Sequence, residues 1–79
     1  MNKIILYSSN DCDRCKRVKQ MLNAHKVDYV NVDDKSVMVN KGFEQVPVLE
    51  VGDRIIEDYS LILGWLKENN YYAIMEEIW

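Results

Sequence analysis

The two cysteines of the chain, Cys12 and Cys15, stand three positions apart in the segment DCDRC. A polar loop precedes them, and helix-forming residues follow to about residue 26. A cysteine in the first turn of a helix faces unpaired backbone N–H groups and the positive end of the helix dipole, and both favour thiolate over thiol. The second cysteine lies one turn further on, within reach of a disulfide bond. The spacing therefore predicts a dithiol site in which Cys12 is the nucleophile and Cys15 resolves the mixed disulfide.

Two other uses of this cysteine pair remain open. A purely structural disulfide between residues so close would remove little chain entropy, and two cysteines are few for a disulfide-stapled mini-protein. A structural zinc site needs four protein ligands, whereas this chain has no second cysteine pair and its lone histidine, His25, lies about three helical turns away. We expect His25 to be a surface or helix-cap residue and the chain to hold no metal. A small zinc-binding interaction module is the alternative from another class.

Length and composition limit the classes of protein to consider. The chain has 79 residues, which predicts one domain over residues 1–79. Ten basic and thirteen acidic side chains give a net charge of -3, which argues against a nucleic-acid partner. No run of residues approaches the ~20 apolar positions that cross a bilayer, and the first apolar run is too short for a signal peptide. We therefore expect a cytoplasmic monomer with no membrane partner.

The elements around the cysteines follow a strand-helix-strand pattern. An isoleucine-rich strand is expected over residues 3–7, a helix over residues 12–26 and a second strand over residues 28–32. Asn10 or Asp11 is the expected N-cap of that helix. A unit of this kind within about thirty residues predicts that its two strands are parallel.

The second half of the chain predicts a hairpin between two helices. Residues 33–42 hold one or two helical turns ended by Gly42; strands follow at 46–51 and 54–56, and a last helix runs to about residue 69. The order β-α-β-α-β-β-α predicts an α/β fold with a four-stranded mixed sheet and helices on both faces. Residues 71–79 form a C-terminal extension with an expected extra helix, which either enlarges the core or leaves an aromatic patch for a partner.

Three segments together resemble one known family. They are YSSNDCDRCKRVKQML, residues 29–33 and GFEQVPVLEVGD, and they resemble a glutaredoxin over about residues 3–69. The resemblance implies a thioredoxin-like fold and an enzyme, a thiol–disulfide oxidoreductase that reduces protein disulfides. It is strongest to the glutaredoxin-like redoxins that donate electrons to ribonucleotide reductase, which implies that enzyme as a target.

The same resemblance implies a substrate site beside the cysteines. It implies a cis bond between Val46 and Pro47, which leaves the Val46 backbone free to pair with an extended thiol peptide; a trans proline that starts an edge strand is the alternative. For Tyr7 and Tyr59, packing within the fold is the alternative to substrate contact. The residues expected to contact substrate are Tyr7, Arg14, Val46, Pro47, Asp58 and Tyr59.

The sequence departs from the family where glutathione would bind. Glutathione-using members carry a Gly-Gly pair at the place of Glu57 and Asp58, so that the backbone and the helix start can approach the tripeptide. Two acidic side chains should repel the glutathione carboxylate there. We therefore expect no bound cofactor and an external reductant, with thioredoxin reductase favoured over glutathione. A glutathione-dependent glutaredoxin is the alternative enzyme.

Overall fold

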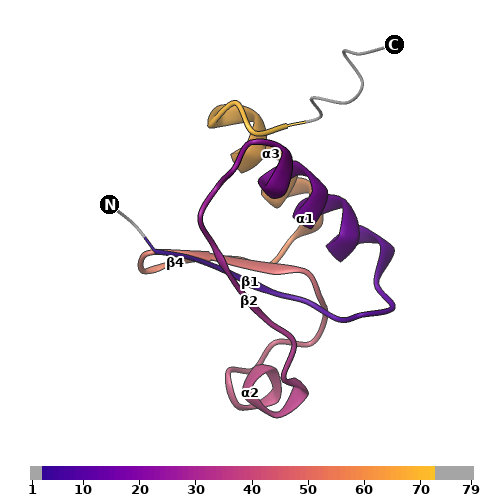
Figure 1. Ribbon diagram of the computed structural model, residues 1–79. Helices are drawn as coiled ribbons and strands as arrows, with labels where there is room; N and C mark the ends of the chain where they lie inside the picture. The colour runs from indigo at the N-terminus through magenta and orange to yellow at the C-terminus, as the bar shows by residue number, and fades with distance from the viewer. Residues whose placement is uncertain (1–2, 73–79) are drawn as a thin grey trace.

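The computed structural model describes residues 3–72 (Figure 1). Within this range the chain forms four strands and three helices in the predicted order β-α-β-α-β-β-α. The elements are β1 (Ile4–Tyr7), α1 (Asp13–Ala24), β2 (Val30–Val32), α2 (Lys35–Asn40), β3 (Val48–Val51), β4 (Arg54–Ile56) and α3 (Tyr59–Glu68).

The four strands form one mixed sheet in the order β2-β1-β3-β4. Strand β1 pairs in parallel with β2, because the connection through α1 brings the chain back to the same end of the sheet. It pairs antiparallel with β3, and β4 returns antiparallel beside β3 after a tight turn in which Gly52 has a φ of 62°. The predicted mixed sheet, with parallel first and second strands, is confirmed.

Helices cover both faces of the sheet, as expected. Helices α1 and α3 lie together on one face and α2 lies on the other (Figure 1). Along β1 the side chains alternate, so that Leu6 enters the cluster under α1 and α3 while Tyr7 enters the smaller cluster beside α2. The larger cluster contains the buried residues Leu6, Val18, Met21, Leu22, Leu49, Val51, Ile56, Ile62, Trp65 and Leu66.

The start of α1 differs from the sequence prediction. The N-cap is Cys12, whose sulfur accepts a hydrogen bond from the Cys15 backbone N–H, so the expected cap at Asn10 or Asp11 was wrong. The Asp11 carboxylate instead accepts a hydrogen bond from the Ser9 hydroxyl, at 2.6 Å. The helix ends at Ala24 with His25 as its C-cap, which confirms the expected cap role of that histidine.

Glycine and proline define the segment between α2 and β3. Gly42 has a φ of 81°, a conformation in which glycine is strongly favoured, and the following Phe43 N–H bonds back to the Met38 carbonyl at 3.0 Å. The third strand begins at Val48, two residues later than predicted. The Val46-Pro47 peptide bond that precedes it is cis, as the resemblance implied.

Helix α3 and the residues that follow it complete the described part of the chain. Asp58 caps the helix, and Ile62 and Trp65 are buried, whereas Leu61 is 62% exposed. The helix ends at Glu68, and the Tyr71 N–H bonds to the Leu66 carbonyl at 2.7 Å. The extra helix and the aromatic patch expected in residues 71–79 fall largely on residues 73–79, outside the described part of the chain. None of the helices described is long and apolar enough to cross a membrane.

Candidate active site

Cys12 lies where the loop after β1 enters α1. Its Sγ accepts a hydrogen bond from the Cys15 N–H at 3.1 Å and lies 4.0 Å from the Val46 carbonyl oxygen. The sulfur therefore sits at the N-terminal end of α1 with a backbone N–H donor directed at it. The residue is partly exposed, so a disulfide from another molecule can reach it.

Cys15 has the opposite environment. It is completely buried, on the face of α1 that also carries Val18 and Leu22. Burial, and in second place the hydrogen bond to Cys12, raise the pKa of the Cys15 thiol to about 12. Cys15 therefore keeps its proton at neutral pH and stays out of contact with external disulfides. Of the two sulfurs, only Cys12 is placed to meet a substrate.

The segment before β3 faces the Cys12 sulfur. Within residues 3–72, the Val46 N–H and carbonyl make no hydrogen bond to another backbone group. The Val46 carbonyl oxygen instead lies 4.0 Å from the Cys12 sulfur. An extended peptide approaching Cys12 therefore finds a backbone donor and acceptor available for strand-like pairing.

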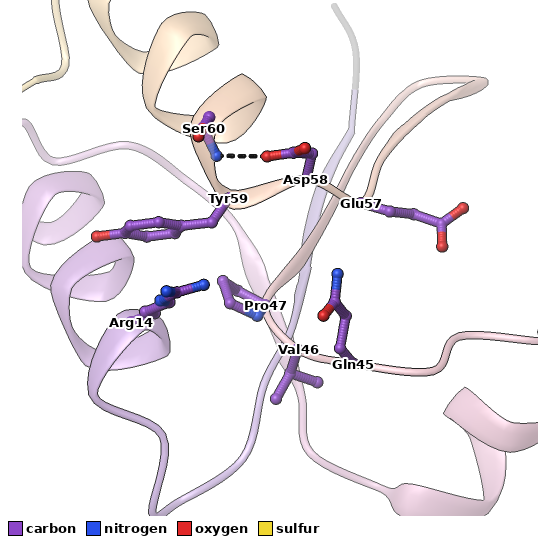
Figure 2. Close-up of a pocket in the computed structure, with 8 residues that line it drawn as sticks. All are labelled: Arg14, Gln45, Val46, Pro47, Glu57, Asp58, Tyr59 and Ser60. Carbon is purple, nitrogen blue, oxygen red and sulfur yellow. Dashed lines mark hydrogen bonds between the residues drawn. The ribbon is translucent and has the colours of Figure 1, made fainter.

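A polar cavity of about 250 Å³ opens beside this segment (Figure 2). The Arg14 guanidinium lies over the Tyr59 ring, 5.0 Å from its centroid. Figure 2 shows the Glu57 side chain directed away from Arg14, on the far side of the cavity. The structure brings together here five of the six residues expected to contact substrate, namely Arg14, Val46, Pro47, Asp58 and Tyr59.

Asp58 has a structural partner within this cavity. Its Oδ1 accepts a hydrogen bond from the Ser60 N–H at 2.8 Å and thereby caps α3 (Figure 2). The Asp58 carboxylate thus takes up one of the free backbone N–H groups that the start of a helix would otherwise offer to an anionic ligand. The carboxylate of a bound ligand would be repelled by the negative charge of Asp58.

Tyr7, the sixth expected contact, lies apart from the cavity. It is 2% exposed, and its hydroxyl donates a hydrogen bond to the Glu50 carboxylate at 2.7 Å. Its ring packs against the edge of Phe43, with 5.0 Å between centroids. Burial, followed by the Glu50 contacts, raises the pKa of Tyr7 to about 12. These contacts favour the packing alternative over substrate binding, because strand alternation turns the side chain toward α2.

Sequence reasoning missed several residues of the site. Gln45 and Ser60 line the polar cavity, and a second, largely apolar cavity of about 490 Å³ is formed with Met38, Val39 and Phe43. The position of Gln45 directly before Val46 was the one available signal. Among residues 3–72 no group of three or more histidine, cysteine, aspartate or glutamate side chains is placed to hold a metal ion.

Comparison with known proteins identifies the family. Residues 4–56 match the glutaredoxin family model. The chain is 36% identical over 56 residues to the glutaredoxin-like protein NrdH of Lactococcus lactis subsp. lactis, which covers 63% of this chain and 78% of that protein. The NrdH protein of Lactococcus lactis subsp. cremoris is 34% identical over the same length. The chain therefore belongs to the glutaredoxin family. With its Cys-x-x-Cys pair, it is a glutaredoxin-like thiol–disulfide oxidoreductase.

Solved structures agree on the fold. The NrdH-redoxin of Escherichia coli superposes with a TM-score of 0.60 at 24% identity, over 76% of this chain and 90% of that one. A Nu-class glutathione transferase of Haemonchus contortus gives 0.72 at 23% identity, over 92% of this chain but 38% of that one. A glutathione transferase homologue of Drosophila mojavensis with bound glutathione gives 0.66 at 27% identity, and the chain spans 37% of its length. The predicted thioredoxin-like fold is confirmed.

Proposed function

We propose that the chain reduces disulfides of protein substrates by a dithiol cycle in which Cys12 attacks and Cys15 resolves. The observation that supports these roles is the contrast between the two sulfurs. Cys12 is accessible and accepts an N–H hydrogen bond at the start of α1, whereas Cys15 is buried with its pKa raised to about 12. The two residues thus differ in exposure and in hydrogen bonding, which suits a nucleophile that meets the substrate and a resolving thiol held behind it.

The cycle conserves atoms and electrons at each step. The Cys12 thiolate attacks one sulfur of the target disulfide, forms a mixed disulfide and releases the other sulfur as a thiolate. The Cys15 thiol then attacks Cys12 Sγ, which closes the Cys12–Cys15 disulfide, and its proton passes to the second substrate sulfur, which leaves as a thiol. Two electrons from an external dithiol or thiol reductant reopen that disulfide. Every group in this cycle comes from one chain, so a monomer suffices, and a reducing cytoplasm is the compartment that fits.

Substitution of each cysteine tests the assignment. Cys12→Ser should abolish reduction of a protein disulfide such as those of insulin. Cys15→Ser should retain the first attack and accumulate a covalent complex with the substrate, visible as a mass increase that dithiothreitol removes. The double substitution is the matched control and should do neither. Undiminished turnover by Cys12→Ser would contradict the proposed roles.

The external reductant that we favour is thioredoxin reductase. The Asp58 carboxylate caps α3 within the cavity where a glutathione carboxylate would enter, and the neighbouring Glu57 adds a second negative charge. Both oppose an anionic tripeptide by like-charge repulsion. Parallel assays should therefore show turnover with thioredoxin reductase and NADPH, and far slower turnover with glutathione, glutathione reductase and NADPH. The reverse ranking would establish the glutathione-dependent alternative.

Ribonucleotide reductase is the target that we propose to test first. The segments DCDRC and GFEQVPVLEVGD resemble redoxins that serve this enzyme, and the two curated relatives carry the name NrdH. The measurement is deoxyribonucleotide formation by a ribonucleotide reductase from the same source, with this chain as the electron donor. Product formation that is no greater than with the Cys12→Ser variant would exclude this target.

A further inference from the structure

The second cavity, which we call the α2 groove, is lined from α2 and the loop that follows it, whereas the polar cavity is lined from α1 and the segment that leads into α3. Its apolar wall consists of Met38, Val39 and Phe43, from α2 and the loop that follows it. Its volume is about 490 Å³. Gln45 and Val46 line both cavities, so the two meet at the segment that faces the Cys12 sulfur.

Local structure explains why the groove is open. Helix α2 has only six residues, and the Gly42 turn brings Phe43 back so that its N–H bonds to Met38 and its ring packs on Tyr7. Met38 is thereby buried, whereas the next residue, Val39, is left 66% exposed. Val39 therefore contributes little to the core, and its apolar surface faces solvent beside the redox site.

The polar residues of the groove give it no clear preference for a charge. Lys35 and Glu44 both line it and carry opposite charges. The groove therefore distinguishes ligands mainly by how much of their apolar surface it removes from water. The polar cavity on the other side of Val46 has the charged side chains Arg14, Glu57 and Asp58 instead.

We propose that the α2 groove receives a large apolar side chain of the substrate peptide, carried next to the cysteine that Cys12 attacks. This inference rests on the proposed function. The attacked sulfur must reach Cys12 Sγ, which lies against the Val46 carbonyl. A peptide that pairs with the Val46 backbone there passes between the two cavities. Residues on one side of its cysteine then meet the apolar groove, and those on the other side meet the polar cavity.

Matched peptide disulfides test the proposal. Each peptide carries one cysteine as a mixed disulfide with thionitrobenzoate, and leucine replaces serine on the amino-terminal or the carboxy-terminal side of that cysteine. The pre-reduced protein is mixed with each peptide, and absorbance of released thionitrobenzoate gives the second-order rate constant. Leucine on one side alone should raise this constant about tenfold, a factor typical of partial burial of such a side chain.

Variants at two similarly exposed apolar residues, Val39 and Leu61, separate the groove from the rest of the surface. Val39→Asp should remove the leucine preference, and the near-isosteric Val39→Thr should weaken it. Leu61→Asp is the matched control, because Leu61 is 62% exposed on α3 and lines neither cavity; it should keep the preference. The Val39 variants are judged by the ratio of the leucine rate to the serine rate, in which a change in Cys12 reactivity cancels, and circular dichroism verifies that they are folded. The wild-type protein and Leu61→Asp should also reduce the small mixed disulfide of 2-mercaptoethanol and thionitrobenzoate at equal rates.

The possible outcomes distinguish this proposal from the proposed function. A wild-type protein without the preference would overturn the groove as a substrate subsite, as would a preference that survives Val39→Asp or one that Leu61→Asp removes equally. A leucine effect of equal size on both sides of the cysteine would overturn it too. Failure of the wild-type protein to reduce even the small disulfide would instead refute the dithiol cycle itself.

Discussion

Brief treatment of the reduced protein with iodoacetamide at neutral pH should modify Cys12 and leave Cys15 free. Alkylation proceeds through the thiolate, so its rate follows the fraction of each thiol that has lost its proton. Cys15 is completely buried, and its pKa is raised from 9.0 to about 12. Cys12 is partly exposed and accepts a hydrogen bond from the Cys15 N–H. The two thiols should therefore react at very different rates.

The size of the difference follows from the pKa of Cys15. A rise from 9.0 to about 12 lowers the thiolate fraction at pH 7 about a thousandfold relative to an unperturbed thiol, before any steric protection is counted. The Cys15 rate should increase about tenfold per pH unit without a plateau below about pH 12. Because the folded pKa exceeds the unfolded one, the fold holds a proton that the unfolded chain releases. The associated stability is complete below pH 9 and is lost as the pH rises from 9.0 toward about 12.

The sequence itself makes the assay simple. Lys-C cleaves after Lys3 and Lys16, so both cysteines fall in one peptide of residues 4–16, and fragmentation between them in tandem mass spectrometry measures each thiol separately. The protein unfolded in denaturant is the control and should be labelled at both positions. In Cys12→Ser, Cys15 should stay slow, since burial rather than the Cys12 contact is the larger cause of its raised pKa. Labelling of Cys15 in the native protein at a rate comparable to Cys12 would refute the proposed asymmetry.

Three further substitutions test the structural supports of the site. Asp58→Ala removes the cap that accepts the Ser60 N–H and should cost about 1 kcal/mol, seen as a melting temperature about 4–8 °C lower, while Asp58→Asn should retain most of it. Gly42→Ala meets no atom within 4 Å but must adopt a φ of 81°, so the urea midpoint should fall by an amount equivalent to about 1–2 kcal/mol with an unchanged slope. Tyr7→Phe removes the hydrogen bond to Glu50 and should cost about 1 kcal/mol at pH 7. Because the pKa of Tyr7 is raised from 10.0 to about 12, its ionisation should lower the stability of the wild-type protein as the pH rises between these values. Urea titrations at several pH values should show that Tyr7→Phe lacks this contribution.

The element order was predictable from local patterns. The helical spacing of Cys15, Val18 and Leu22 predicts one buried face of α1, and all three are fully buried. The apolar runs before and after Gly52 predict the hairpin that became β3 and β4. Parallel pairing of β1 and β2 follows from the intervening helix. Each of these inferences depends on neighbours within one or two turns of chain, which a single sequence contains.

The details of the site depend on contacts between distant segments. The α1 cap depends on which of several polar side chains the loop directs at the Cys15 N–H; Cys12 accepts this N–H, while Asp11 accepts from the Ser9 hydroxyl. The burial of Tyr7 depends on Phe43 and Glu50, which lie more than thirty positions away in the sequence. The α2 groove requires the short α2 and the segment around Val46 to lie beside each other. None of these arrangements produces a periodic signal in the sequence.

The different environments of the two sulfurs follow from the register of one helix. Residues in an α-helix advance about 100° each, so Cys15, Val18 and Leu22 lie on the same face and are buried together. Cys12 precedes the first helical residue, Asp13, and therefore remains at the cap, with its sulfur held by the Cys15 N–H. One residue inserted between Arg14 and Cys15 would leave Cys15 on the buried face. It would also break the three-position spacing through which the cap reaches that N–H. The packing that stabilises α1 thus also determines which sulfur a substrate can reach.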